Sequence, residues 1–446
     1  MTRAAAVLGL LLAACTPAQS APTTIQPIAS DPAPATTSPA PDPAPTTTTS
    51  TTTTSTTTTT TVATVEAEGS VAAASGVPLD DALITSSIAT VTSNDEGEFT
   101  VELQPGDTIT VQRPAWLPTE LSWEEGESLN VVLEPRLVNG LRVSRYVAME
   151  PDSFERLLAM ADGSAVNALV FDTKDETGQV LYDTGVEYPH QIGAVEEVYD
   201  PVELIAMADA HGLYTITRLV AFEDPIRVKA DPDTKLAGAW VDMSDSANWG
   251  YLFDLATEAC ELGFDEIQFD YVRFPAGITG SALAKNGTFT EEGRLAAISA
   301  FLAEARSRLH PMQCAVAADI FGIIMSSPTD EGVGQKVEET SAQVDVLSPM
   351  VYPSHYSPGW LGYGDPNDHP GPVVADALAG AVRMNPAAIL RPWLQAFYYT
   401  PTQIGAEISE ASSDGYGWML WNAGGNYNPS ALPPEEQQTA EGDEAS

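Results

Sequence analysis

The sequence has few basic residues. Lys and Arg number 19 against 62 Asp and Glu, which gives a formal net charge of −43 over 446 residues. Such a field repels phosphate backbones, so we expect no nucleic-acid partner. The acidic residues are spread along the chain, which is typical of a solvated acidic surface and favours neutral or cationic ligands.

Several chemical motifs are also missing. The five His are scattered, and the chain has no HxH, HExxH or CxxC, so we expect no metal site and no other cofactor. A GxSxG nucleophile motif is absent as well, which argues against a serine hydrolase. A metal hydrolase such as a deacetylase remains a third alternative for the function.

Long apolar runs are absent after the first residues, and none later in the chain could cross a bilayer. Arg3 and the apolar run 4–14 have the charged start and short hydrophobic core of an export signal. The end of this run, "LAAC", resembles the lipobox of bacterial lipoproteins, which implies that Cys15 becomes the lipidated N-terminus. The chain would then be exported and anchored to the cell membrane, facing outside the cytoplasm. An ordinary secretory signal cleaved near Ala21 is the alternative.

Cysteine is scarce: apart from Cys15, the chain has only Cys260 and Cys314. An exported protein meets an oxidising compartment, where a disulfide between them is allowed. Two buried free thiols are the alternative, and the sequence does not choose between them.

Composition divides the chain into parts. We predict a lipoprotein signal peptide at 1–14, a disordered Pro/Thr-rich linker at 15–61, a small β-sandwich at 62–135, a large α/β domain at 137–428 and an acidic disordered tail at 429–446. The linker is too polar to bury a core. Short alternating segments separated by turn signals predict an antiparallel sandwich. Phrases such as "GVPLDDALIT" and "PGDTITV" resemble carboxypeptidase-regulatory-like domains, although "AWLP" stands where that family usually has Gly-Tyr-x-Pro.

The large domain alternates strand and helix patterns. We expect strands at 141–148, 168–172, 215–221, 266–271, 315–321, 344–352, 389–397 and 417–422. Such repetition predicts a (β/α)8 TIM barrel. A doubly wound open sheet is the alternative, but "RYVAMEPDSF" after the first strand lacks the glycine-rich phosphate loop of that fold.

Polar residues recur at the C-terminal ends of these strands, where barrel enzymes have their active sites. We assign catalysis to Asp270 and Asp319, on adjacent strands, because two facing carboxyl groups can divide the work of glycoside hydrolysis. Substrate binding is assigned to Asp172, Lys174, Arg218, Gln268, Arg273, Tyr352, His355, Trp393, Gln395 and Trp421. Trp393 and Trp421 offer rings on which sugars could stack.

The stretch "FDEIQFDYVRFP" raises a question about its faces. Phe269 and Tyr271 are expected to pack on helices, while Gln268 and Asp270 face the barrel interior. A buried carboxylate needs a partner. A structural ion pair of Asp270 with Arg273 or Lys174 is the alternative to a catalytic role, and Asp172 has Lys174 nearby in the same way.

A family resemblance rests on the phrases "NALVFDTKDETG", "TRLVAFEDP", "ELGFDEIQFDYVRFP", "ADIFG" and "LSPMVYPSHY". The whole barrel is similar to the "Putative glycosyl hydrolase domain" family, a glycoside-hydrolase-like TIM barrel. By analogy with α-amylase-like retaining enzymes, this resemblance makes Asp270 the nucleophile and Asp319 the acid. Such enzymes usually have Glu at the second position, so Asp172 or a loop acid stays an alternative acid.

The resemblance therefore implies a retaining glycosidase that acts on an extracellular or cell-envelope polysaccharide or oligosaccharide. We expect a monomer. The alternative is a non-catalytic glycan-binding or envelope-scaffold lipoprotein that has kept the barrel.

Overall fold

The computed structural model describes residues 64–277 and 290–434. The expected signal peptide, Cys15 and linker lie outside the described residues, as do residues 435–446 of the expected tail. The chain divides into units 1–60 and 61–446, and only the second contains described residues. No helix in this described part is long and apolar enough to span a membrane.

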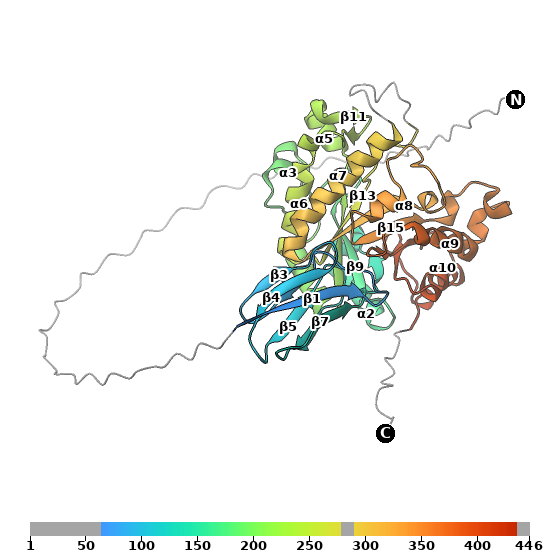
Figure 1. The fold of residues 1–446 in the computed structure, drawn as a ribbon. Helices are drawn as coiled ribbons and strands as arrows, with labels where there is room; N and C mark the ends of the chain where they lie inside the picture. The colour runs from blue at the N-terminus through green and yellow to red at the C-terminus, as the bar shows by residue number, and fades with distance from the viewer. Residues whose placement is uncertain (1–63, 278–289, 435–446) are drawn as a thin grey trace, which may run out of the picture. The chain divides into compact units, whose positions relative to one another are not determined.

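The small domain has two sheets that share one hydrophobic core (Figure 1). Its strands are β1 Val65–Ala73, β2 Leu83–Thr85, β3 Thr90–Thr92, β4 Glu98–Leu103, β5 Thr108–Gln112, β6 Thr119–Ser122 and β7 Leu129–Leu133. The sheet orders are β4-β1-β7 and β3-β2-β5-β6. In β4 every second residue is buried, the two-residue period of a strand with one face on a core. The expected antiparallel pairing holds except that β1 and β7 run parallel.

The large domain is a closed barrel of parallel strands, which confirms the TIM-barrel prediction. Its strands are β8 Asn139–Arg142, β9 Ala168–Lys174, β10 Tyr214–Val220, β13 Glu266–Asp270, β14 Ala315–Phe321, β15 Val346–Val351, β16 Ile389–Leu390, β17 Trp393–Gln395 and β18 Trp418–Trp421. Neighbouring strands follow the order β14-β13-β10-β9-β8-β18-β17-β15, and β14 also pairs with β15. This last pairing closes the sheet, so the open doubly wound alternative is excluded.

Helices surround the barrel. They are α1 Arg145–Ala148, α2 Pro151–Asp162, α3 Glu187–Ile192, α4 Pro201–Ala210, α5 Pro225–Ala230, α6 Gly250–Leu262, α7 Glu291–Leu309, α8 Val337–Ser341, α9 Pro370–Leu378 and α10 Pro401–Ser413. Their starts follow local chemistry. The Asp200 carboxylate caps α4, and Thr400 and Gln403 form a reciprocal capping box at α10, each helix having proline in its first turn. A separate two-stranded sheet joins β11 Lys235–Ala237 to β12 Trp240–Val241.

Two expectations about strand ends need correction. The predicted strand 141–148 stops at Arg142 as β8, and α1 begins at Arg145. Val143 still donates its backbone N–H to the Val170 carbonyl (2.7 Å), and Ser144 is the N-cap of α1, a helix start that the buried Val143 and Val147 on either side hide in the sequence. Likewise, β13 ends at Asp270, so the Tyr271 ring packs on Trp240 instead of a helix (centroids 5.8 Å apart).

The other faces of β13 are as expected. The Phe269 ring packs edge-on against Phe301 of α7 (centroids 5.1 Å apart). Gln268 and Asp270 point the other way, into the barrel. A Cys260–Cys314 disulfide joins α6 to the residue before β14 and decides between the two alternatives for these cysteines.

Charged residues join the small domain to the N-terminal ends of the barrel strands. The Arg113 guanidinium contacts Asp80 (3.0 Å) and Asp345, the residue before β15 (3.4 Å). His310 also reaches Asp345 through Nε2 (2.9 Å). Ala317 and Val346 of the barrel belong to the core of the small domain. The small domain therefore covers the end of the barrel opposite the C-terminal strand ends.

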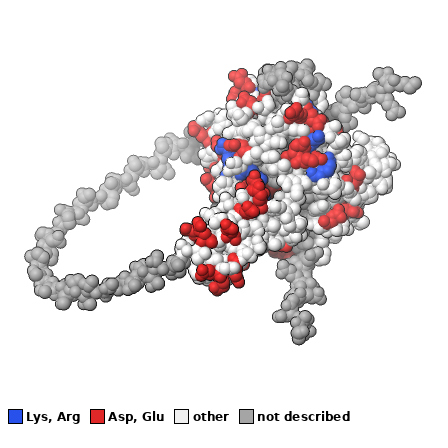
Figure 2. All heavy atoms as spheres, in the orientation of Figure 1, with Lys and Arg blue, Asp and Glu red and all other residues white. Residues whose placement is uncertain are grey.

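Acidic side chains are prominent on the surface. Figure 2 shows Asp and Glu scattered over the visible face and only small clusters of Lys and Arg. This distribution agrees with the excess of acidic residues in the sequence.

Candidate active site

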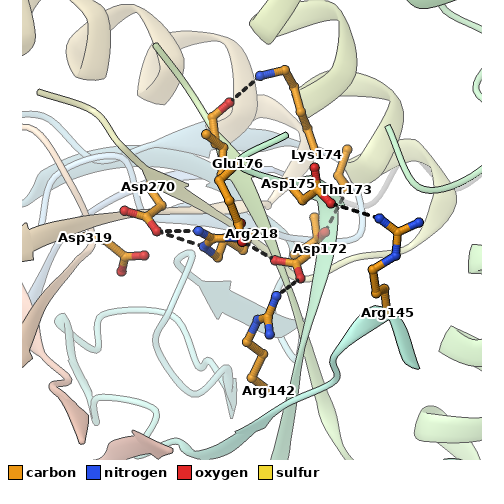
Figure 3. A network of polar contacts seen from close by, with 12 residues as sticks. Arg142, Arg145, Asp172, Thr173, Lys174, Asp175, Glu176, Arg218, Asp270 and Asp319 are labelled. Carbon is orange, nitrogen blue, oxygen red and sulfur yellow. Dashed lines mark hydrogen bonds and ion pairs between the residues drawn. The ribbon is translucent and has the colours of Figure 1, made fainter. Parts of the chain in front are cut away.

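A network of buried charges occupies the C-terminal ends of three neighbouring strands (Figure 3). Because β10 lies between β9 and β13, its Arg218 reaches a carboxylate on each side. Nη1 donates to Asp172 on β9 (2.9 Å), Nε donates to Oδ2 of Asp270 on β13 (2.8 Å), and Nη2 forms an ion pair with the same oxygen (2.7 Å). Arg142 of β8 donates to the second oxygen of Asp172. Each buried charge therefore has an opposite charge beside it, as burial requires.

Asp270 also receives a hydrogen bond from the backbone. The N–H of Tyr271 donates to its Oδ1 (2.6 Å) because Tyr271 has φ +50°. This left-handed conformation is rare for a bulky residue and costs on the order of 1–3 kcal/mol. Strain of this kind clusters at functional sites. Both oxygens of Asp270 thus accept hydrogen bonds from donors that stabilise a negative charge.

Asp319 is the neighbour of Asp270 on the next strand. Phe269 lies beside Ala318 in the β13–β14 register, so the two following aspartates are adjacent, at the strand spacing of about 4.8 Å. Asp319 is only 1% exposed. Its Oδ1 accepts a hydrogen bond from the Trp393 indole (2.9 Å), whereas its Oδ2 is buried without a hydrogen-bond partner among the described residues.

The two aspartates therefore have different environments. Burial, and next the charge of Asp270, raise the pKa of Asp319 well above its usual range, although Arg218 and the Trp393 indole oppose the shift. The raised pKa favours the protonated form of Asp319, whereas the hydrogen bonds from Arg218 and the Tyr271 N–H stabilise a negative charge on Asp270. Two carboxyl groups whose environments differ in this way can serve as an acid and a nucleophile.

Tryptophans line one side of the network. The guanidinium groups of Arg142 and Arg218 lie over the Trp421 ring, 4.2 and 4.9 Å from its centroid, in cation–π contact. Trp421 is half-buried. Trp393 stands edge-on to it (centroids 5.3 Å apart) and is fully buried, so its observed contact is with Asp319 rather than with the solvent.

Tyr352 and His355 follow β15 at the same end of the barrel. Tyr352 is 6% exposed, and burial, with the charge of Asp319 next, raises the pKa of its hydroxyl well above the usual range. The His355 ring stands edge-on to it (centroids 5.3 Å apart) and is largely exposed. Partial burial lowers the pKa of His355, so its imidazole is neutral at neutral pH.

Three residues predicted to bind substrate are fully buried and bonded to the protein. The Lys174 ammonium contacts Asp224 (3.1 Å) and the Val220 carbonyl (2.9 Å). Gln268 donates to the Ser348 hydroxyl inside the barrel (3.2 Å). Gln395 accepts from the Ser354 hydroxyl (2.8 Å). The structure therefore gives these side chains, like Trp393, structural partners and no exposed surface.

Arg273 and Asp270, considered as an ion pair from the sequence, have other partners in the structure. Arg273 lies between the rings of Trp240 and Phe321 (4.6 and 4.3 Å from their centroids), and burial lowers its pKa. Asp270 pairs with Arg218 instead of Arg273 or Lys174. The spacing of Asp172 and Lys174 allowed an ion pair between them, but Asp172 contacts Arg142 and Arg218 on the two neighbouring strands instead.

Two acidic residues near the network were not predicted, because the site residues were sought only at the C-terminal ends of the expected strands. Glu176 is about half exposed, and its carboxylate lies 3.4 Å from Nη1 of Arg218. Glu223 follows β10 and is half-buried, and this burial raises its pKa. Both stand only a few residues beyond a strand end, so extending the search into the following loops could have found them. Within the described ranges, no group of three or more His, Cys, Asp or Glu is arranged to hold a metal ion.

Comparisons with solved structures give distant matches. The glycoside hydrolase domain of PgaB (BpsB) from Bordetella bronchiseptica is 11% identical, covers 65% of this chain and 94% of its own, and has a TM-score of 0.47. The C-terminal domain of a protein titled a putative chitinase, from Desulfitobacterium hafniense, is 13% identical over 66% of this chain and 96% of its own, with a TM-score of 0.46.

A hypothetical protein from Ruminiclostridium thermocellum is more similar in sequence, at 29% identity over 40% of this chain and 96% of its own, with a TM-score of 0.35. No curated protein matches the sequence. The family model described as "Putative glycosyl hydrolase domain" matches residues 140–427, nearly the whole barrel and more than half of the chain. The chain therefore belongs to this glycosyl hydrolase domain family.

Proposed function

We propose that the protein is a retaining glycoside hydrolase that cleaves an extracellular or cell-envelope polysaccharide. The observation that carries the proposal is the adjacent pair of Asp270 and Asp319, of which the first accepts hydrogen bonds from Arg218 and the Tyr271 N–H and the second has a raised pKa. Family membership supports the same class of reaction. Division into a charged and a protonated carboxyl group is what glycosidic cleavage requires.

The proposed reaction has two steps. Asp319 gives its proton to the glycosidic oxygen while an oxygen of Asp270 attacks the anomeric carbon, so the leaving sugar departs as an alcohol and a glycosyl ester remains on Asp270. The Asp319 carboxylate then takes a proton from water, whose oxygen attacks the anomeric carbon and releases Asp270. The distance between the two carboxyl groups in a substrate complex would test this route, because retention needs about 5–5.5 Å between them and inversion about 6.5–9.5 Å.

Surrounding residues support both steps. Arg218 holds Asp270 from the side of β10 and Asp172 beyond it, which fixes the orientation of the nucleophile. Trp421 offers a flat ring at the mouth, on which an apolar sugar face could stack. Burial, with the charges of Asp319 and Asp270 next, raises the pKa of the Tyr352 hydroxyl well above its usual range, so this group stays a hydrogen-bond donor.

A library of polysaccharides and oligosaccharides tests the proposal. The wild type should release reducing ends from at least one member, while Asp270→Asn and Asp319→Asn should each lose about 10²- to 10⁴-fold in rate. Binding of the same glycan by both variants would show that they are folded. A wild type that binds a glycan but cuts none would favour the alternative, a glycan-binding or scaffold lipoprotein.

We also propose that the chain is exported and anchored through Cys15. The charged start, the short apolar run and the "LAAC" sequence support this, and the Cys260–Cys314 disulfide suits an oxidising compartment. Mass spectrometry of the N-terminal peptide should find a diacylglyceryl group on Cys15 in a bacterial host. Cys15→Ser should abolish that modification and the membrane association. An unmodified peptide starting near Ala21 would instead indicate an ordinary secretory signal.

A further inference from the structure

Tyr398 has two unfavourable features at once. Its side chain is 94% exposed, and its backbone has φ +62°, the left-handed region that costs a residue with a Cβ about 1–2 kcal/mol. The residue lies in the short loop between β17 and α10, at the C-terminal end of a barrel strand. In barrel enzymes these loops build the active site. An exposed and strained aromatic residue at this position points to a ligand.

A path of aromatic rings connects Tyr398 to the carboxyl pair. Tyr398 stands edge-on to Phe397, and Phe397 edge-on to Tyr352, with 5.5 Å between centroids in both cases. Tyr352 in turn lies close enough to Asp319 for the charge of that carboxylate, after the larger effect of burial, to raise the pKa of the Tyr352 hydroxyl. His355 adds a ring 6.3 Å from that of Phe397. The rings thus lead outward from Asp319 to the exposed tyrosine.

Buried hydrogen bonds hold the loops that carry these rings. Gln395 accepts from the backbone N–H and the hydroxyl of Ser354 (3.1 and 2.8 Å), and donates to the side chain of Asn367 and the carbonyl of Phe397 (3.3 and 3.2 Å). The Tyr399 hydroxyl donates to the Asn367 carbonyl (2.9 Å). Two loops far apart in the sequence are therefore tied together beneath the rings. Such preorganisation lowers the entropic cost of binding.

We propose that Tyr398, supported by Phe397, is a stacking platform for a sugar ring beyond the one held at Asp270 and Asp319. The inference rests on the proposed function and narrows it, because a second ring site requires an oligosaccharide or polysaccharide chain as substrate. A pyranose has a flat apolar face that covers an exposed aromatic ring, while its hydroxyl groups stay in solvent. One exposed ring at the barrel end that carries the carboxyl pair suits this ligand better than a protein partner, which needs a much larger surface.

The test compares sugar chains of increasing length. The probes are N-acetylglucosamine and glucose oligomers, from disaccharide to hexasaccharide, with the wild type, Tyr398→Ala and Tyr398→Phe. Tyr398→Ala should weaken binding and raise KM by about 3- to 10-fold for the long chains, with a smaller effect on the disaccharide. Tyr398→Phe keeps the ring and should retain most of the affinity.

Two further variants separate stacking from other effects. Tyr398→Gly removes the ring and also relieves the left-handed strain, so it should lose as much affinity as Tyr398→Ala while being more stable. Val382→Ala removes an apolar side chain that is 90% exposed in the 3-10 turn Ala379–Arg383 and controls for loss of exposed apolar surface. It should show no length dependence.

The outcomes distinguish the two proposals. If the wild type cuts a glycan and Tyr398→Ala weakens all chain lengths equally or none, the platform is overturned while hydrolysis stands. If the wild type binds long chains through Tyr398 but cuts none, the platform stands and the proposed hydrolysis fails. If no chain binds to the wild type, the platform is overturned as well.

Discussion

The indole of Trp393 donates a buried hydrogen bond to Asp319, with 2.9 Å between Nε1 and Oδ1. This hydrogen bond opposes the rise in the pKa of Asp319 that burial and the charge of Asp270 cause. Trp393→Phe should therefore raise the pKa of Asp319 further and move the alkaline limb of the pH profile of kcat/KM to higher pH. A matched control is Trp418→Phe, because Trp418 is equally buried but packs in the outer core. An unshifted limb in Trp393→Phe would show that Asp319 is not the acid.

Asp319→Asn should stabilise the fold at neutral pH. Because the folded pKa of Asp319 is raised, its contribution to stability is present below the unfolded pKa of about 4 and is lost as pH rises through the folded value. Asparagine does not lose a proton, so the melting temperature of the variant should exceed that of the wild type above about pH 4. Below that pH the two should converge.

Asp330→Asn is the matched contrast, with the opposite sign. Asp330 is buried beside Arg294, and although burial opposes the shift, hydrogen bonds from Arg294 and the backbone lower its pKa. Its contribution is therefore present above the unfolded pKa and is lost as pH falls through the folded value. This variant should be less stable than the wild type at neutral pH. Equal destabilisation by both substitutions would contradict the assigned protonation of Asp319.

Arg218→Lys should damage stability and activity together. The guanidinium donates to Asp172 and Asp270 at once, and a lysine ammonium cannot reproduce that fork. A buried carboxylate oxygen left without its donor costs about 1–3 kcal/mol of unfolding free energy, measured in urea. Arg308→Lys is the control, because its pair with Glu304 is exposed and worth under about 0.5 kcal/mol. Wild-type stability in Arg218→Lys would show that the network is not coupled through this residue.

His310 should make stability depend on pH at the junction of the two domains. Burial opposes the shift, but the charge of Asp345 and hydrogen bonds to Asp345 and Asp81 raise the pKa of His310. The stabilisation is therefore fully present below the unfolded pKa of about 6.5 and is lost as pH rises through the folded value. His310→Gln should flatten this part of the curve of melting temperature against pH. His211→Gln, which removes an exposed pair with Asp162, should leave it intact.

Much of the fold could be predicted because the residue period of each strand or helix, and the order of these elements along the chain, can be recognised without knowledge of the tertiary contacts. The alternating burial of β4 and the repeated strand and helix pattern are local signals, so the positions of the barrel strands were found with errors of a few residues. The end of β8 was placed too late because the N-cap Ser144 stands between buried apolar residues that continue the strand pattern.

The candidate site was predicted less completely, because strand ends identify positions but not partners. Asp270 and Asp319 lie on adjacent strands, as the order of the predicted strands indicated, and their catalytic roles stay a prediction. The pairing of Asp172 with Arg142 and Arg218 depends on the register of the adjacent strands β8, β9 and β10, which no local pattern contains. Likewise, nothing in the sequence around Trp393 shows that its indole faces Asp319 across the intervening strand β15 rather than a substrate.

Trapping of the covalent intermediate tests the central claim most directly. The wild type would be incubated with a 2-deoxy-2-fluoro glycosyl fluoride of the sugar that the library identifies, then digested and mapped by mass spectrometry. The proposed mechanism predicts one added fluoroglycosyl group on the peptide containing Asp270, with Asp319 unmodified. A label on another carboxylate, or an unlabelled enzyme that releases a product of inverted anomeric configuration, would contradict it.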